Sequence, residues 1–363
     1  MLCSSNGGGL GHLTRLMAIA RRLPAAIDAV FVTMSVGLPL VAREGYIAEY
    51  IPPAATLRAD NQAWHRYLRQ RMDKLIDRYE PDVLVFDGVL PYRGLLDSWR
   101  GQERCKVWLR RAMWRSATLS PSSPGETAHA FDLVIEPGEI AVANDVGATT
   151  VDRRGVRRVP PIVHLDESEL VSREAACDAL GLDRSRPAAF LSLGAGNIND
   201  VGVTIRRIVD KLRATGDVQP VVMRSPITAH GSRSEGHGAV LVRSVYPVSR
   251  YLRAFDVAFS AAGYNSFHEL IAFAVPTVFV PNEYAIVDDQ GARARFAEWA
   301  GAALTASEWS ADELVRRVDA VLDPHLQAHL TARCRQVFPG NGAAAAATLL
   351  ADLATARTSG RGF

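Results

Sequence analysis

Short apolar segments alternate along this chain with longer segments in which apolar residues recur every three or four positions. Segments that are apolar at consecutive positions are typical of strands buried on both faces within a parallel sheet. The predicted strands are Val30–Met34, Val83–Asp87, Lys106–Leu109, Asp132–Ile135, Ala188–Leu193, Gln219–Met223, Ala239–Val242, Val257–Ser260 and Thr277–Val280.

The longer segments place their apolar residues on one face of a helix. The predicted helices are Leu13–Leu23, Asn61–Tyr79, Ser172–Leu180, Gly202–Thr215, Asn265–Phe273, Asp289–Trp299, Ser310–Leu322 and Gly342–Ala356. Because strands and helices alternate in this way twice, the sequence predicts an α/β fold with two Rossmann-like, doubly wound domains.

Two adjacent prolines, Pro160 and Pro161, separate the two halves. Prolines stiffen a connection and end regular structure, as a hinge between domains requires. The sequence therefore predicts domains at residues 1–160 and 161–341, followed by a C-terminal helix and tail at 342–363. We expect the tail Arg357–Phe363 to be frayed.

The composition is that of a soluble globular protein, with 48% hydrophobic and 22% charged residues among 363. The net charge of +2 is too small to indicate a nucleic-acid partner. The charge is uneven, because residues 1–160 contain 21 Lys and Arg against 17 Asp and Glu. This basic half suits an anionic acceptor or a membrane surface, or it is simply an Arg-rich surface.

The four cysteines are far apart in the sequence and show no metal-binding or C-x-x-C spacing, which favours a reduced, cytoplasmic protein. They are Cys3, Cys105, Cys177 and Cys334. The chain runs straight into a glycine loop without a signal peptide. Its longest weakly polar segment, Ala29–Ala42, falls short of the ~20 apolar residues that span a bilayer.

The glycine loop Asn6-Gly-Gly-Gly-Leu-Gly-His12 lies between a short strand and a helix. Glycines there let an anionic ligand approach the backbone N–H groups at the helix start. The loop matches neither the dinucleotide fingerprint nor a Walker loop, so His12 is the more specific feature. The helix dipole lowers the pKa of His12, and a neutral imidazole can take a proton from an acceptor hydroxyl. Packing within the loop is the alternative.

Asp87 ends a predicted strand at the same sheet edge as the glycine loop. A carboxylate in that place can orient a histidine base or stabilise its charged form. An ordinary aspartate that caps the following turn is the alternative.

Three segments of the second half follow predicted strands and should therefore meet at one edge of a sheet. They are Ser192–Asn197, Ala262–Leu270 and Asp288–Gln290. The helix start after Gly263 is a natural seat for a diphosphate, and Glu269 can accept two hydrogen bonds from a ribose diol. Ser266 and Glu269 also match a capping box, which needs no ligand. The Asp-Asp-Gln group supplies acceptors for sugar hydroxyls, or it is an acidic first turn.

The order of these motifs resembles that of the GT-B glycosyltransferases and is most similar to the family 28 branch, which contains the N-acetylglucosaminyltransferase of lipid II synthesis. The similarity covers nearly the whole chain and is most specific from Phe255 to Ala294. It implies two Rossmann-like domains that face each other across a cleft. It also implies transfer of a hexose from a nucleotide-diphosphate sugar of the UDP type to an acceptor hydroxyl.

The resemblance implies a role for each motif. Gly8, Gly9 and Gly11 would form the acceptor-side loop, with His12 as the base. Gly194, Gly196 and Asn197 would form the loop near the donor phosphates, and Val245 would contact the nucleobase. Gly263, Asn265 and Ser266 would seat the diphosphate, and Glu269 would bind the ribose. Asp289 and Gln290 would contact the donor sugar. No Asp-x-Asp metal motif is present, and no metal or cofactor is expected. Helix N-termini and backbone donors would stabilise the leaving diphosphate.

Two features bear on the substrates. Asp288-Asp289-Gln290 differs from the double Gln common in the lipid II enzyme, which leaves the donor sugar open. The acceptor is a small molecule or a lipid-linked one, of the cell envelope or of secondary metabolism. The basic and aromatic run Lys106–Arg115 fits an anionic lipid or a lipid-diphosphate acceptor at the inner face of the membrane. A strand followed by a basic loop is the alternative.

Three other functions fit parts of the sequence. Gly9-x-Gly11-His12-x-x-Arg15 is similar to the opening of the UDP-sugar hydrolase of pseudaminic acid synthesis, in which water is the attacking group. A non-hydrolysing sugar epimerase needs paired carboxylates that the sequence does not locate. A non-catalytic sugar-nucleotide binder would keep the donor site without turnover.

Overall fold

The chain folds into two units, each built on a parallel sheet. The computed structural model describes residues 1–5, 9–115, 127–151, 155–194, 201–227, 240–242, 245–285, 287–307 and 309–360. One unit consists of Met1–Glu139, Val146–Ile162 and Gly342–Phe363, and the other of Ile140–Asp145 and Val163–Asn341.

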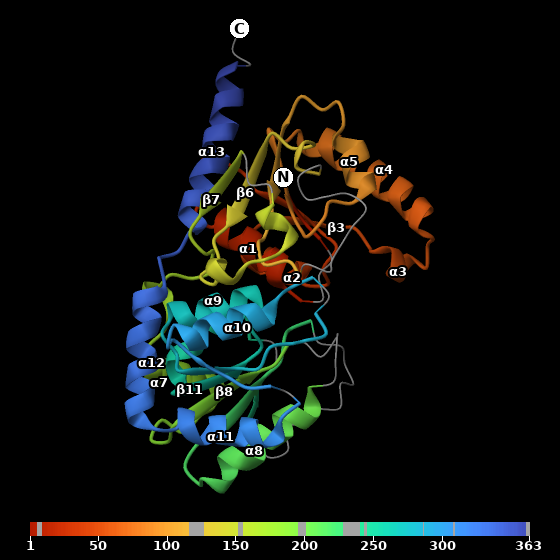
Figure 1. Cartoon of the computed structure of the whole chain (residues 1–363). Coiled ribbons are helices and arrows are strands. Elements are labelled where there is room, and N and C mark those ends of the chain that lie inside the picture. The colour runs from red at the N-terminus through yellow and green to blue at the C-terminus, as the bar shows by residue number, and fades with distance from the viewer. Residues whose placement is uncertain are drawn as a thin grey trace. The chain divides into compact units, whose positions relative to one another are not determined.

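The first unit contains a seven-stranded parallel sheet in the order β3-β2-β1-β4-β5-β6-β7 (Figure 1). Its strands are β1 (Leu2–Ser4), β2 (Val30–Thr33), β3 (Ile47–Tyr50), β4 (Val83–Asp87), β5 (Cys105–Leu109), β6 (Leu133–Pro137) and β7 (Val156–Val159). Its helices are α1 (Gly11–Ala20), α2 (Leu38–Arg43), α3 (Ala54–Leu57), α4 (Asn61–Tyr79), α5 (Arg93–Trp99), the 3-10 turn η2 (Ala148–Thr150) and α13 (Ala343–Gly360).

Helices α1 and α13 contact each other and both contact β4, so the last segment of the chain covers the first helix. Helix α1 buries the predicted stripe of Leu13, Leu16, Met17 and Ala20. Helix α13 continues to Gly360, four residues beyond the predicted end at Ala356.

The second unit contains a six-stranded parallel sheet in the order β10-β9-β8-β11-β12-β13. Its strands are β8 (Ala188–Ser192), β9 (Gln219–Met223), β10 (Val240–Val242), β11 (Val257–Ser260), β12 (Thr277–Phe279) and β13 (Leu304–Thr305). Its helices are α7 (Arg173–Leu180), α8 (Gly202–Ala214), α9 (Tyr264–Ala272), α10 (Gln290–Trp299), α11 (Ala311–Val321) and α12 (Pro324–Val337). Its 3-10 turns are η1 (Val142–Asn144), η3 (Glu167–Glu169) and η4 (Val248–Ala254).

Both faces of this second sheet are covered. Ala188 and Phe190 of β8 pack in one hydrophobic cluster, and the alternate residues Ala189 and Leu191 pack in another. Helices α9 and α10 lie on one side of the sheet, and α8 and α11 on the other (Figure 1). This is the burial on both faces that consecutive apolar residues predicted.

The strand orders of the two sheets follow one pattern. In each sheet, the unit's first strand is third from one edge, and its second and third strands fill the two places out to that edge. The later strands lie on the other side of the first strand, which is the Rossmann order. The prediction of two doubly wound α/β sheets is confirmed. Ligands of such sheets bind at the carboxyl ends of the strands, where the strand order reverses.

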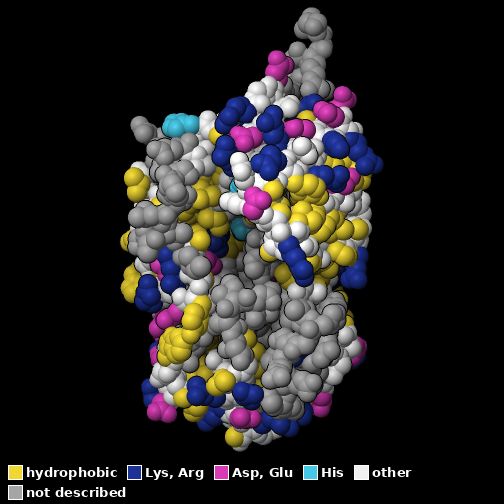
Figure 2. All heavy atoms as spheres, turned by 90° about the vertical axis from the view of Figure 1, so that its right-hand side faces the viewer, with side chains coloured by type: hydrophobic (Ala, Val, Ile, Leu, Met, Phe, Trp, Pro, Cys, Tyr) yellow, Lys and Arg dark blue, Asp and Glu magenta, His cyan; other side chains and the backbone are white. Residues whose placement is uncertain are grey.

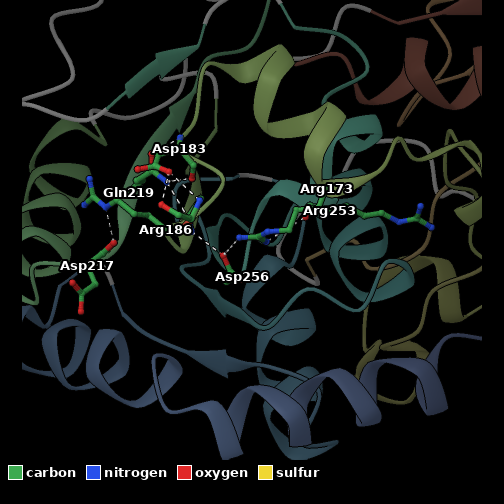
Figure 3. A network of polar contacts seen from close by, with 9 residues as sticks. Arg173, Asp183, Arg186, Asp217, Gln219, Arg253 and Asp256 are labelled. Atoms are coloured by element: carbon green, nitrogen blue, oxygen red, sulfur yellow. Dashed lines mark hydrogen bonds and ion pairs between the residues drawn. The ribbon is translucent and has the colours of Figure 1, made fainter.

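A polar network at the amino ends of the strands holds the second sheet in register (Figure 3). Nη2 of Arg173 donates to Oδ2 of Asp256 at 2.9 Å, and the same oxygen accepts from the backbone N–H of Ala188 at 2.8 Å. Gln219 is hydrogen-bonded to both the N–H and the carbonyl of Asp183. A cavity of about 360 Å³ lined in part by Asp256 lies at this edge, away from the carboxyl ends.

The surface of the first unit mixes basic and acidic side chains with a hydrophobic patch, in the upper part of Figure 2. On α4 and α5, exposed arginines pair with carboxylates one turn away, as in Arg69–Asp73 and Arg93–Asp97. Some arginines of this half are therefore engaged in exposed ion pairs, which contribute little to stability. No helix in the described part of the chain combines the length and hydrophobicity needed to cross a bilayer.

Candidate active site

The carboxyl ends of β1 and β4 meet at the point where the strand order of the first sheet reverses. Ser4 of β1 lies opposite Asp87 of β4 in the register. The chain leaves β1 through the glycine loop and enters α1 at Gly11, two residues earlier than predicted. His12 therefore lies in the first turn of α1, beside the end of β4.

Asp87 receives hydrogen bonds from two side chains of α1. Nδ1 of His12 lies 2.7 Å from Oδ1 of Asp87. Arg15 donates from Nε to Oδ2 at 2.9 Å and from Nη2 to Oδ1 at 2.5 Å. Asp87 is fully buried, Arg15 is buried, and the His12 side chain is 16% exposed. Asp87 thus binds His12 rather than capping the next turn.

The charges in this cluster favour a neutral imidazole beside an ionised carboxylate. Burial lowers the pKa of His12 and Asp87 opposes that shift, while Arg15 and Arg111 lower the pKa further. Burial alone would raise the pKa of Asp87, but the charges and hydrogen bonds of Arg15 and His12 bring it below its ordinary value. With Nδ1–H donated to ionised Asp87, Nε2 is the nitrogen that can accept a proton.

The glycines at the start of α1 leave space around the backbone. A Cβ added at Gly9 or Gly11 would meet no heavy atom within 4 Å, and neither residue has the positive φ that requires glycine. Helix α1 also begins without a capping hydrogen bond from its N-cap, Leu10. The partial positive charge of such a helix start favours a nearby anion. Gly8 lies outside the described residues.

The basic and aromatic run Lys106–Arg115 includes most of β5 and is mostly structural. Trp108 and Trp114 are buried, which favours the alternative of a strand followed by a basic loop. Arg110 is fully buried and pairs with Glu136 at 3.5 Å. Arg111 is the residue of this run whose charge acts on His12.

The second sheet repeats this arrangement at the ends of β8 and β11, where Ser192 lies opposite Ser260. Gly194, just after β8, has φ +106°, a conformation that favours glycine. Gly196 and Asn197 lie outside the described residues. After β11, helix α9 begins at Tyr264 with Gly263 as its N-cap and no capping side chain.

The start of α9 excludes a capping box formed by Ser266 and Glu269. Because the N-cap is Gly263, Ser266 is the third residue of the helix and cannot form a capping box with Glu269. Helices α7, α10, α11 and α12 are each capped by a Ser or Asp side chain, whereas α8 and α9 are not. The uncapped starts follow the two central strands, β8 and β11, as the start of α1 follows β1.

Glu269 is a buried carboxylate, 9% exposed, that faces η4. Burial raises its pKa to about 7, and the nearby Ser249 side chain and the backbone of His164 partly oppose this shift. Val245, the residue expected to contact a nucleobase, lies just before η4. It packs against the hydrophobic cluster that contains Phe267 and Leu270 of α9. The structure therefore brings the expected base and ribose contacts to neighbouring elements.

The start of α10 lies beside the start of α9. A Cβ added at Gly263 would meet only Nε2 of Gln290, at 3.9 Å, and the Oε1 of Gln290 accepts from the N–H of Asn282 at 3.0 Å. Asp289 caps α10 by accepting from Ala292 at 2.9 Å, so its carboxylate has the structural role that the sequence left open.

A buried arginine links these two helix starts. Nη1 of Arg293 donates to Oδ1 of Asp288 at 2.5 Å and to the carbonyl of Ala262 at 3.2 Å. Its guanidinium also lies 5.8 Å from the ring centroid of Tyr264. Arg293 therefore ties the turn before α9 to the Asp-Asp-Gln group.

In the first unit the structure brings Gly9, Gly11, His12 and Asp87 together. In the second it brings together Gly263, Glu269 and Gln290, with Asn265 and Ser266 in the first turn of α9. Sequence reasoning missed the partners of these residues, which are Arg15, His164, Ser249 and Arg293. Among the described residues, no group of three or more His, Cys, Asp or Glu side chains is placed to hold a metal ion.

Residues 237–347 match the model of the glycosyltransferase family 28 C-terminal domain. The UDP-N-acetylglucosamine–N-acetylmuramyl-(pentapeptide) pyrophosphoryl-undecaprenol N-acetylglucosamine transferase of Bacillus licheniformis is 28% identical over 167 residues, which are 43% of this chain and 45% of that protein. This chain thus spans about half the length of that relative. The enzyme of the same name from a Nocardioides species is 27% identical over 304 residues, 76% of each chain.

Two solved structures are similar over nearly the whole chain. MurG of Acinetobacter baumannii has a TM-score of 0.61 at 13% identity and covers 96% of this chain and 98% of its own. The spinosyn rhamnosyltransferase SpnG, complexed with thymidine diphosphate, has a TM-score of 0.64 at 15% identity and covers 96% and 99%. At these identities the likeness shows a shared fold.

Proposed function

Because the chain is a GT-B protein related to glycosyltransferase family 28, we propose that it moves a sugar from a nucleotide-diphosphate sugar, of the UDP type, to an acceptor hydroxyl. The observation that carries this proposal is the pairing of His12 with buried Asp87 at the strand-order reversal of the first sheet. The second sheet offers an uncapped helix start and a buried carboxylate at the equivalent edge.

In this proposal the second unit binds the donor. The start of α9 holds the diphosphate, because a helix N-terminus carries partial positive charge. Gly263 supports this role, since a Cβ added there would meet, among the described residues, only the amide of Gln290, so a ligand can approach the backbone. Glu269 accepts hydrogen bonds from the ribose diol, and Gln290 and Asp289 lie toward the donor sugar.

His12 acts as the general base of the first unit. The acceptor hydroxyl passes its proton to Nε2 as its oxygen bonds to the anomeric carbon. The bond from that carbon to the diphosphate oxygen breaks, and its electron pair leaves with the nucleoside diphosphate. The α9 N-terminus stabilises the charge that develops on the leaving group, and Asp87 stabilises the imidazolium.

The acceptor in this proposal is a small molecule or a lipid-linked one, and a lipid-linked acceptor would bring the first unit to a membrane surface. The relatives named above include a transferase whose name specifies an undecaprenol-linked acceptor and a rhamnosyltransferase of spinosyn. Exposed Ile47 and Leu57 support a peripheral contact of this kind. A sedimentation assay with anionic vesicles tests it, and equal recovery with and without vesicles would exclude it.

A thermal-shift screen of nucleoside diphosphates and their sugars tests the donor. A ligand that binds the folded state raises the melting temperature by mass action, so the preferred base and sugar appear directly. We expect uridine diphosphate and one of its sugars to give the largest shift. Glu269→Gln should reduce that shift, whereas Glu44→Gln, an exposed glutamate of the first unit, should not.

Turnover is then measured as release of nucleoside diphosphate with and without a panel of acceptors. A transferase releases it mainly when the acceptor is present, whereas rapid release of free sugar without acceptor would indicate a hydrolase. A donor that binds but never turns over would indicate a binding protein and would contradict the proposed role of His12.

A further inference from the structure

Arg15 is a charged residue of α1, a helix whose residues from Leu13 to Ala20 are all buried. It lies between Leu13 and Leu16 in sequence and is 2% exposed. A guanidinium in such a place needs a charged partner that satisfies its donors. That partner is Asp87, which lies 72 residues away and is 0% exposed.

The contact between Arg15 and Asp87 is bidentate. Nε donates to Oδ2 at 2.9 Å and Nη2 donates to Oδ1 at 2.5 Å, so the carboxylate plane is fixed by the planar fork of the arginine. The same Oδ1 accepts Nδ1–H of His12 at 2.7 Å. Arg15 and His12 are three residues apart on α1 and therefore reach the carboxylate from one helix face.

We propose that Arg15 is a positioning residue for His12, which it controls through Asp87. It holds the carboxylate in one orientation, so that the proton of the neutral ring stays on Nδ1 and Nε2 stays free. It also balances the charge of Asp87, so that the carboxylate does not make His12 a permanent cation. The inference rests on the proposed function for its use in turnover, but the state of His12 is measured without any substrate.

Three charged side chains act on His12, from the three elements around it. Asp87 ends β4, Arg15 lies on α1, and Arg111 follows β5. Nη2 of Arg15 is 3.0 Å from Nδ1 of His12. Asp87 accepts a hydrogen bond from each of these two nitrogens, so both carry hydrogen and do not bond to each other. The short distance therefore places the positive charge of Arg15 beside the ring of His12. Without Arg15, His12 would face an uncompensated carboxylate and would hold its own proton more tightly.

Nuclear magnetic resonance of the full chain labelled with ¹⁵N-histidine tests the proposal, with His12→Gln used to assign the His12 signals. In the wild type we expect one neutral form, protonated at Nδ1, and protonation of the ring only below its ordinary pKa. In Arg15→Met the ring should titrate at higher pH. Arg15→Lys should keep the lower titration and lose the single neutral form, since lysine keeps the charge without the fork.

Arg22→Met is the matched control, because Arg22 follows α1, ten residues after His12, and its Nη1 donates to the backbone carbonyl of Ala18. It should leave the His12 signals unchanged. If Arg15→Met titrates like the wild type with the same neutral form, the proposal is wrong. If that variant does not fold, the wild-type spectrum still decides, because a ring that is protonated at Nε2 or charged at neutral pH contradicts the assignment.

A second arm uses turnover of the UDP-sugar that the thermal-shift screen selects. Arg15→Met should lower kcat/KM by about 10²-fold, the size of effect that a misplaced catalytic group produces, and move its acid limb to higher pH. Donor affinity should remain. Absence of turnover in the wild type would reject the proposed function and leave the magnetic resonance result standing on its own.

Discussion

Replacing Glu269 by Gln removes a charge that the folded protein holds in an unfavourable place. The side chain is 9% exposed. Burial raises its pKa from 4.5 to about 7, although Ser249 and the backbone of His164 partly oppose the shift. Glutamine has nearly the same shape and keeps an oxygen acceptor, so the substitution changes charge with little change in packing.

The size of the effect follows from the pKa. A rise from 4.5 to about 7 corresponds to about 3 kcal/mol, at about 1.4 kcal/mol for each pH unit. For an acid whose pKa is raised by folding, the stabilisation is fully present below the unfolded pKa and is lost as the pH rises through the folded one. The wild type should therefore lose about 3 kcal/mol of unfolding free energy relative to Glu269→Gln over that range.

Urea unfolding at about pH 5 and about pH 8 measures this difference for the wild type, Glu269→Gln and the control Glu44→Gln. Glu269→Gln should be about as stable as the wild type at the lower pH and more stable at the higher pH, and the control should follow the wild type at both. A variant that is less stable at the higher pH, or a difference that does not change with pH, would falsify the account of Glu269 as a buried and costly charge.

The same carboxylate links donor binding to protons. A ribose diol that donates two hydrogen bonds to Glu269 favours the ionised form, so binding below the pKa of about 7 should release a proton. Calorimetry of uridine diphosphate in buffers of different ionisation enthalpy detects this release, which should approach about one proton for each nucleotide bound at acidic pH. Glu269→Gln should bind more weakly and release none.

Three further substitutions and one pH profile have defined outcomes. His12→Gln should lower kcat by about 10³-fold at unchanged donor affinity, and parallel loss of affinity in calorimetry would contradict its role as a base. The acid limb of kcat/KM in the wild type should lie below pH 6.5, because burial lowers the pKa of His12, and a limb above that value would count against the neutral ring. Gly11→Ala should raise stability by about 0.5 kcal/mol yet reduce turnover, since a Cβ there meets only open space; full activity would mean that no ligand uses that space. Arg293→Met should cost about 3 kcal/mol in urea unfolding because it leaves Asp288 without its cation, and a loss below about 1 kcal/mol would show that the pair adds little.

The elements that the sequence predicted well are those buried on both sides. Strand β4 was placed at Val83–Asp87, where the structure has it, because its apolar residues are consecutive. The missed strands lie at or near sheet edges or are very short: Ile47 of β3 is 54% exposed, and β13 has only two residues. Helix α12 was missed because it buries little beyond Leu330 and Cys334, which makes no clear stripe.

The residues of the candidate site also divide into those that the sequence predicted and those that it missed. His12 and Asp87 were found because their positions after strands fix them at one sheet edge. Arg15, Ser249 and Arg293 were missed because each acts through a partner brought close only by folding. Arg15 carried no signal of burial, because it lies on the side of the helix opposite Leu13 and Leu16 and is buried only by the fold around it.

The first unit is discontinuous in sequence, because it begins with β1 and is completed by α13 after the whole second unit has been made. Where the chain returns, the N–H of Gly342 bonds to the carbonyl of Pro161 at 2.8 Å, and α13 then covers α1 and β4. During synthesis on the ribosome, the second unit can therefore assemble before α13 emerges, and until then the side of α1 that α13 covers stays exposed. Truncation within α13 should leave the second unit folded and make the first unit prone to aggregation.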